Sequence, residues 1–120
     1  MDLRIKTTSY KLTPEVAKYL DQKLVSLEKL LGAEAAKKTR CEVEIGKASG
    51  KNSSDYMYYA EIRIYTTGGK PLYARNHAAT PNAAIDDVKE EAERQVRKEK
   101  KSRTTDNKKK GREVKRKLRS

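Results

Sequence analysis

The sequence predicts an α+β fold in which a four-stranded sheet carries two helices packed on one face. Four short segments alternate aliphatic and polar residues, as half-buried strands do. Two longer segments repeat apolar residues at spacings of three and four, as amphipathic helices do. The predicted order is β-α-β-β-β-α. Because each strand has one aliphatic face, two helices suffice to cover one side of the sheet and leave the other to water.

The first predicted strand and helix lie within the opening 32 residues. Leu3 and Ile5 alternate with charged residues, which indicates a half-buried strand. Thr13 and Pro14 then stand where a helix takes a capping residue and tolerates proline. Gly32 is placed to end this helix. Its apolar stripe consists of Val16, Leu20, Leu24, Leu27 and Leu31.

Three further strands are expected around residues 40–45, 59–65 and 72–75, where aliphatic and polar residues alternate again. Residues 46–57, rich in Gly, Ser, Lys and Asn, are expected to form a loop. Residues 67–70, Thr-Gly-Gly-Lys, indicate a hairpin turn. The first helix is long enough for a crossover, so the first two strands are expected to be parallel and the other pairs antiparallel.

The second predicted helix spans residues 81–101. Thr80 can cap it, and Pro81 sits where a helix tolerates proline. Acidic residues near its start and lysines near its end suit the helix dipole. Its apolar stripe consists of Ile85, Val88, Ala92 and Val96. We expect one face to be buried and the other to meet a polyanion. The competing interpretation is a solvated helix laced by acid–arginine pairs four residues apart.

The charge points to an anionic partner. The 120 residues include 29 Lys and Arg but 17 Asp and Glu, which gives a net charge of +12 and a pI of about 9.8. Nucleic acid and an anionic membrane are the two partners that such a charge suits. Residues 102–120 hold nine basic and two acidic residues. We therefore expect one domain over residues 1–101 and a basic tail over 102–120 that is disordered when free.

The sequence offers no constellation for catalysis, so no enzyme, catalytic residue, metal site, cofactor or small-molecule substrate is predicted. Residues 46–52 echo a phosphate-binding loop, but the glycine spacing is one residue short and Asn52 replaces the magnesium-binding hydroxyl. His77 has no partner at a known spacing. Cys41 is expected to be a buried structural thiol. The lack of a long apolar run and the single cysteine favour a cytoplasmic protein with no spanning helix or signal peptide.

Four segments in order resemble the family of ribosome hibernation promoting factors, also called ribosome-associated inhibitors or sigma-54 modulation proteins. They read LTPEVAKYLDQKLVSLEKLL, CEVEIGK, YAEIRI and NAAIDDVKEEAERQVRKEKK. The resemblance covers about residues 1–101 and implies the same β-α-β-β-β-α fold. It implies binding to the small ribosomal subunit in the cleft for mRNA and the A- and P-site tRNAs, and silencing of translation in resting cells. Long family members continue into a dimerisation domain, so this sequence is expected to be a short form.

The resemblance also implies that basic residues on both helices contact ribosomal RNA. The candidate RNA-binding residues are Lys23, Lys29, Arg94, Arg97, Lys98, Lys100 and Lys101. Two positions depart from the family pattern: Ser26 stands where a basic residue is frequent, and Glu91 where many relatives have lysine. Each departure removes a candidate phosphate contact.

The predicted partners are the small ribosomal subunit and its RNA, and both single ribosomes and ribosome pairs remain candidates. A general double-stranded-RNA or ribosomal-RNA binder of the same layout is the alternative function. A membrane-surface role is disfavoured because the tail lacks the aromatic and leucine content that inserts into headgroups. Tyr59, Tyr65 and Tyr73, on the polar side of the sheet, are further candidates for stacking on bases.

Overall fold

The computed structural model describes residues 1–48 and 57–119, with side chains described up to residue 102. Its elements follow one another as β1 (Asp2–Thr8), α1 (Pro14–Leu31), α2 (Ala33–Lys37), β2 (Arg40–Lys47), β3 (Tyr58–Tyr65), β4 (Leu72–Ala78) and α3 (Pro81–Arg119). The predicted α+β class and the order of its strands and long helices are confirmed.

The four strands form one sheet in the order β1-β2-β3-β4. β1 pairs with β2 in parallel, with Leu3 opposite Cys41. β2–β3 and β3–β4 are antiparallel, with Val43 opposite Ile62 and Ile62 opposite Ala74. The expected pairing directions are therefore confirmed. The parallel pair requires a crossover, and α1 with α2 supplies it.

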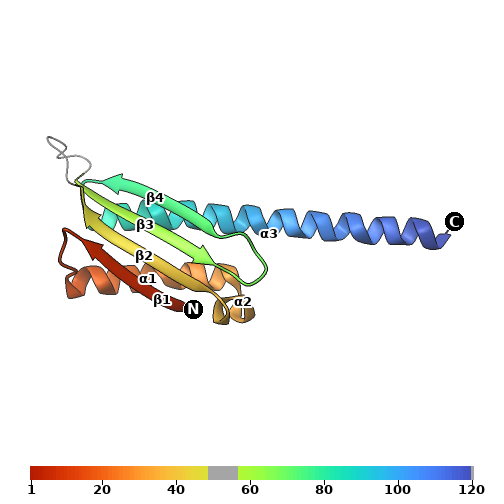
Figure 1. The fold of residues 1–120 in the computed structure, drawn as a ribbon, viewed down its shortest axis with the longest axis horizontal. Helices are drawn as coiled ribbons and strands as arrows, with labels where there is room; N and C mark the ends of the chain where they lie inside the picture. The colour runs from red at the N-terminus through yellow and green to blue at the C-terminus, as the bar shows by residue number, and fades with distance from the viewer. Residues whose placement is uncertain (49–56, 120) are drawn as a thin grey trace.

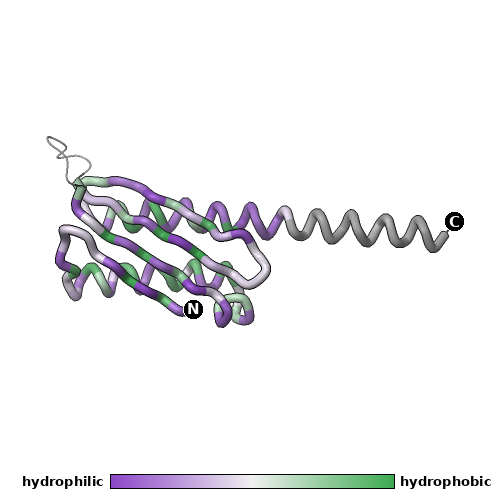
Figure 2. The backbone as a smooth tube through the Cα atoms, in the orientation of Figure 1, coloured by the Kyte–Doolittle hydropathy of each residue, from purple (hydrophilic) through white to green (hydrophobic). Residues whose placement is uncertain are grey.

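Both long helices lie on the same face of the sheet, as predicted, and leave the opposite face uncovered (Figure 1). The core between the layers is aliphatic, and the alternation that builds it is visible along β1, β2 and β3 in Figure 2. Helix α1 contributes Leu20, Leu24, Leu27 and Leu31, and α3 contributes Ala84, Ile85, Val88, Ala92 and Val96. The sheet contributes residues such as Val43, Ile45, Ala60, Ile62 and Ile64.

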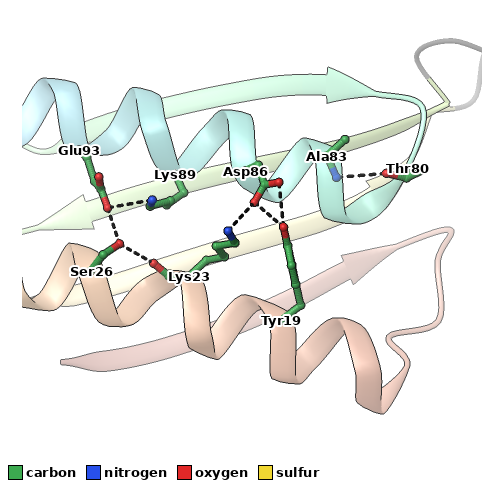
Figure 3. Close-up of polar contacts among 8 residues, drawn as sticks. All are labelled: Tyr19, Lys23, Ser26, Thr80, Ala83, Asp86, Lys89 and Glu93. Carbon is green, nitrogen blue, oxygen red and sulfur yellow. Dashed lines mark hydrogen bonds and ion pairs between the residues drawn. The ribbon is translucent and has the colours of Figure 1, made fainter.

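Capping side chains set the starts of the two long helices. The Thr13 hydroxyl accepts a hydrogen bond from the backbone N–H of Val16 at 3.2 Å. The Thr80 hydroxyl accepts one from the backbone N–H of Ala83 at 3.1 Å (Figure 3). Gly32 ends α1 with a φ of 91°, a left-handed conformation that favours glycine. Both helix starts and the end of α1 lie where the sequence places them.

The structure differs from the sequence prediction in two elements. The short helix α2 was not expected; its Ala-Glu-Ala-Ala-Lys sequence is made of good helix formers but covers barely more than one turn. Helix α3 does not end at residue 101 but continues to Arg119, through residues expected to be disordered, and projects past the sheet (Figure 1). The sequence after residue 101 contains no proline, and its nine Lys and Arg are good helix formers, whereas Gly111 and residues 104–107, Thr-Thr-Asp-Asn, weaken its helix propensity.

The described residues do not test two other predictions. The loop expected over residues 46–57 lies mostly in residues 49–56, outside the described part of the chain, together with most of the segment that echoes a phosphate-binding loop. The division into a domain over residues 1–101 and a basic tail over 102–120 stays a prediction. The last buried residue among those with described side chains is Val96.

Candidate nucleic-acid interface

The uncovered face of the sheet is rich in arginine, but its cations are paired with carboxylates. Glu61 lies 2.9 Å from Arg63 and 3.9 Å from Arg75. Arg40 lies 3.5 Å from Glu42, and Lys6 lies 3.6 Å from Glu44. Arg4 lies 3.4 Å from Asp2 at the edge strand. Each of these cations thus has a carboxylate within 4 Å, which leaves this face poorly suited to phosphate.

The tyrosines of the same face are covered by arginine. The guanidinium of Arg75 lies 4.4 Å from the ring centre of Tyr59, that of Arg40 lies 4.6 Å from Tyr65, and that of Arg63 lies 5.5 Å from Tyr73. The Tyr59 ring rests on Gly46, where a Cβ atom would lie 2.4 Å from it.

The Tyr59 hydroxyl donates to Glu44 at 2.7 Å, and burial raises its pKa. Tyr59 is therefore a packed residue, whereas the stacking of bases on Tyr65 and Tyr73 stays a prediction.

On the opposite side of the domain, α1 and α3 are joined by hydrogen bonds and ion pairs (Figure 3). The Tyr19 hydroxyl donates to the Asp86 carboxylate at 2.7 Å, and the Lys23 ammonium lies 3.4 Å from the same group. The hydrogen bond to Asp86 raises the pKa of Tyr19, and the charge of Asp86 raises the pKa of Lys23. Lys23 is thus half-buried and already paired.

Two helical turns further along α3, Glu93 has three partners. The Ser26 hydroxyl donates to it at 2.6 Å, and its carboxylate oxygens lie 3.5 Å from Lys89 and 3.7 Å from Arg97. Ser26 thus binds α1 to α3. Because Tyr19 meets Asp86, and Ser26 meets Glu93 seven residues later on both helices, α1 and α3 run parallel.

The parallel arrangement brings the C-terminal ends of both helices together. The Lys100 ammonium donates to the backbone carbonyl of Leu30, in the last turn of α1. A lysine in this place satisfies a carbonyl that has no partner within its helix and complements the negative end of the helix dipole.

Arg94 lies on the outer side of α3 and is held by Glu91. Two hydrogen bonds, at 2.7 and 3.0 Å, join the guanidinium to that carboxylate. They lower the pKa of Glu91 and raise that of Arg94. Gln95 donates both to Glu91 and to the backbone carbonyl of Tyr73 at 2.8 Å, which ties α3 to the edge strand β4. Glu91 therefore partly neutralises Arg94, a predicted RNA contact.

Lys29 and Lys98 differ from these residues. Both are exposed, and among the residues with described side chains neither has a carboxylate within ion-pair distance. Lys101 is also exposed on α3. All seven predicted residues thus lie on the helical layer, but Lys23, Arg94 and Arg97 are paired with carboxylates.

Charge is divided along the helical layer. Residues 81–93 of α3 hold five acidic residues and one lysine, whereas residues 94–102 hold five basic residues and one glutamate. Two lysines that sequence reasoning missed, Lys38 after α2 and Lys70 in the β3–β4 turn, lie at the same end of the domain as Leu31 and Lys100. We name this surface the basic end; its residues are Lys29, Lys38, Lys70, Arg97, Lys98, Lys100 and Lys101.

The described residues hold little for catalysis. They contain no group of three or more His, Cys, Asp or Glu side chains that could bind a metal ion. Burial raises the pKa of the Cys41 thiol to about 12, so it is not an activated nucleophile. Within the described part of the chain, no helix has the length and apolar character needed to cross a membrane.

The fold and this surface define a class of protein: a small, basic, two-layer α+β domain whose cations gather at one end of its helical layer. Comparison with known families identifies the family of the chain. It belongs to the family described as sigma 54 modulation protein / S30EA ribosomal protein, whose model matches residues 3–104. This is a family of ribosome-associated factors, and the resemblance inferred from the sequence is confirmed.

Two solved structures share the fold. The Protein Y N-terminal domain of Thermus thermophilus has a TM-score of 0.65 and 22% identity, over 82% of this chain and 98% of that one. A ribosomal subunit interface protein of Coxiella burnetii has a TM-score of 0.65 and 12% identity, over 83% of this chain and 98% of that one. No curated protein matches the chain. At these identities the two structures establish the fold alone.

Proposed function

We propose that this protein is a ribosome hibernation factor that binds the small ribosomal subunit in the mRNA and tRNA cleft and inhibits translation in resting cells. Membership of a ribosome-associated family supports a ribosomal partner. The observation that supports RNA as the contact is the basic end, where Lys29 and Lys98 are exposed without a carboxylate among the described side chains. The name of the Coxiella burnetii relative, a ribosomal subunit interface protein, agrees with a site between subunits.

The proposed mechanism is occupancy, with no covalent chemistry. Lysines and arginines of the basic end contact phosphates and supply affinity through the release of counterions. The shape of the two-layer domain places it in the cleft, since phosphate contacts position a protein without reading sequence. Residues 102–120, with nine basic residues, extend the charged surface along α3 and act as a second, sequence-tolerant RNA anchor.

Competition with tRNA on isolated small subunits tests this function. Small subunits carrying labelled tRNA in the A or P site are titrated with the full chain, and released tRNA is measured. We expect displacement of tRNA and inhibition of a translation reaction at the same protein concentrations. Binding to small subunits without displacement of tRNA would instead support the alternative, a general RNA binder of the same layout. Sedimentation of the bound ribosomes reports whether they stay single or pair.

A further inference from the structure

A small cavity opens at the basic end, where five segments meet. It has a volume of about 130 Å3 and lies between the end of α1, α2, the β3–β4 turn, the start of β4 and α3. Leu31, Leu72 and Val96 form its apolar wall, and the side chains of Thr66 and Thr67 also line it. Pockets for whole drug-sized ligands measure about 300 Å3 or more. This cavity is therefore suited to one flat ring or one side chain, not to a complete small molecule.

Cations surround this cavity. Lys38 lines it from the connection between α2 and β2, Lys70 from the β3–β4 turn and Lys100 from α3, and Glu99 is the one acidic residue lining it. Among the described side chains, neither Lys38 nor Lys70 has an ion-pair partner. Both are exposed. Lys100 is anchored by its hydrogen bond to the Leu30 carbonyl. An apolar recess ringed by lysines from separate elements suits a ligand with an apolar ring and more than one negative charge.

A nucleotide within an RNA strand has this chemistry. Its base is a flat ring, and a phosphate precedes and follows it, so lysines on different sides of the recess can each meet a phosphate. A glutamate or aspartate side chain would bring one charge and no ring. The cavity also adjoins the part of α3 that carries Lys98 and Lys101, so a strand bound along α3 passes its opening. Single-stranded RNA is usually recognised through unstacked bases that are splayed out toward the protein.

We propose that this cavity, the base pocket, receives one unstacked nucleotide of the RNA strand held by the basic end. The inference rests on the proposed function, because it takes ribosomal RNA as the partner. It adds a site for a single base to a surface otherwise expected to contact phosphates. The lysines hold the phosphates on either side, and the Leu31, Leu72 and Val96 side chains contact the base.

Titration of the full chain with nucleoside 5′-monophosphates, followed by methyl NMR, tests the pocket without the ribosome. We expect saturable shifts of the Leu31, Leu72 and Val96 methyl signals, with weaker effects from uncharged nucleosides and from inorganic phosphate. Equal shifts with inorganic phosphate would mean that only the lysines bind, and would overturn the proposal. Stronger shifts of the same methyls by a short acidic peptide would overturn it in favour of a protein partner.

A blocking variant connects the pocket to the ribosome. Ala35 lines the cavity but is exposed, so Ala35→Trp should fill its opening without disturbing the core. Ala33→Trp, on the same helix but outside the lining, is the matched control. We expect Ala35→Trp to abolish the nucleotide-induced shifts and to weaken small-subunit binding about fivefold or more, since the burial of one ring against apolar side chains contributes at least this much. Ala33→Trp should leave both unchanged.

The outcomes separate the pocket from the proposed function. If Ala35→Trp melts as the wild type does and binds small subunits equally well, the base pocket is refuted while competition with tRNA can still stand. A second variant, Lys38→Gln with Lys70→Gln, should weaken the nucleotide-induced methyl shifts without adding bulk, and Lys18→Gln with Lys37→Gln, which removes the same charge outside the cavity lining, serves as its control. If the wild-type chain fails to displace tRNA, the proposed function falls, and the monophosphate titration still decides whether the pocket binds a nucleotide.

Discussion

The uncovered sheet face and the basic end both carry several cations, but those cations differ in their partners. On the uncovered sheet face, Arg63 and Arg75 share Glu61, and Arg40 has Glu42. At the basic end, Lys29, Lys38, Lys70 and Lys98 have no carboxylate partner among the described side chains. A count of basic residues therefore does not identify the face that binds a polyanion. That face is identified by cations that have no carboxylate partner within the protein.

The physical difference between the faces is the cost of exchanging partners. A paired arginine must give up its carboxylate before it can bind phosphate, and the carboxylate left behind repels the incoming anion. An unpaired lysine has only water and mobile ions to release, and that release favours binding. Helix α3 shows the same contrast within one element, since Arg94 is held by Glu91 whereas Lys98, one turn later, is not.

The largest effect is expected from substitutions in the core that separates the two faces. Leu24→Ala in α1 or Ile62→Ala in β3 should each lower the free energy of unfolding by about 2–5 kcal/mol, because both side chains are almost fully buried. Urea denaturation measures the effect. Val25→Ala is the matched control, since Val25 is 47% exposed one residue away. Equal stability of all three variants would mean that the helices do not pack on the sheet as described.

Deletion of residues 102–120 tests whether the basic residues in the last part of α3 contact phosphate. If most of its nine basic residues contact phosphate, the slope of log affinity against log salt should fall by several units, at about 0.7 per single-strand phosphate. Binding to small subunits across a salt series measures this slope. The shortened chain should still fold and displace tRNA, because the described core ends at Val96. An unchanged slope would assign the segment no part in RNA binding.

Charge reversal on each face tests whether unpaired cations contribute more to RNA binding than paired ones. Lys29→Glu with Lys98→Glu should weaken small-subunit binding by about tenfold or more, since two unpaired cations become anions. Arg4→Glu with Lys6→Glu makes the same change of net charge on the sheet face and should cost less than about twofold. Filter binding at one salt concentration compares the pairs. Equal losses from both pairs would show that net charge, not the arrangement of partners, governs binding.

The smallest expected effect comes from releasing a paired cation. Glu91→Gln removes the carboxylate that holds Arg94 and should tighten small-subunit binding by about two- to threefold, the range expected for one exposed ion pair. Glu42→Gln releases Arg40 on the sheet face and should leave binding unchanged. A tightening by both variants would mean that the sheet face also meets RNA.

The sequence predicts the fold well because short-range patterns dictate it. The stripes of α1 and α3, the caps at Thr13 and Thr80, and the alternation around Val43 and Ile62 each specify an element by themselves. Helix α2 and the end of α3 were missed for the converse reason. Five residues are too few for a periodic pattern, and a stretch dominated by lysine and arginine has helix propensity but no stripe.

The candidate site was less predictable, because it depends on contacts between distant segments. Sequence spacing shows that Lys23 lies off the α1 stripe, but not that Asp86 holds it. The Glu93–Arg97 pair follows from spacing within α3, whereas the Ser26 contact to the same Glu93 does not. Lys38 and Lys70 lie in short connections with no pattern, and only the meeting of α2, the β3–β4 turn and α3 brings them to the basic end.

The parallel pairing of α1 with α3 also bears on how the chain acquires its shape. The contacts of Tyr19 with Asp86 and of Ser26 with Glu93 each join residues 67 positions apart, and that of Lys100 with Leu30 spans 70. Contacts between such distant residues form slowly, because a long loop must close first. During synthesis, the inner faces of β3 and β4 lack the cover of α3 until that helix has emerged. Docking of the last helix is therefore expected to be the step that commits the chain to its native state, and a nascent chain without α3 to be the form most prone to aggregate.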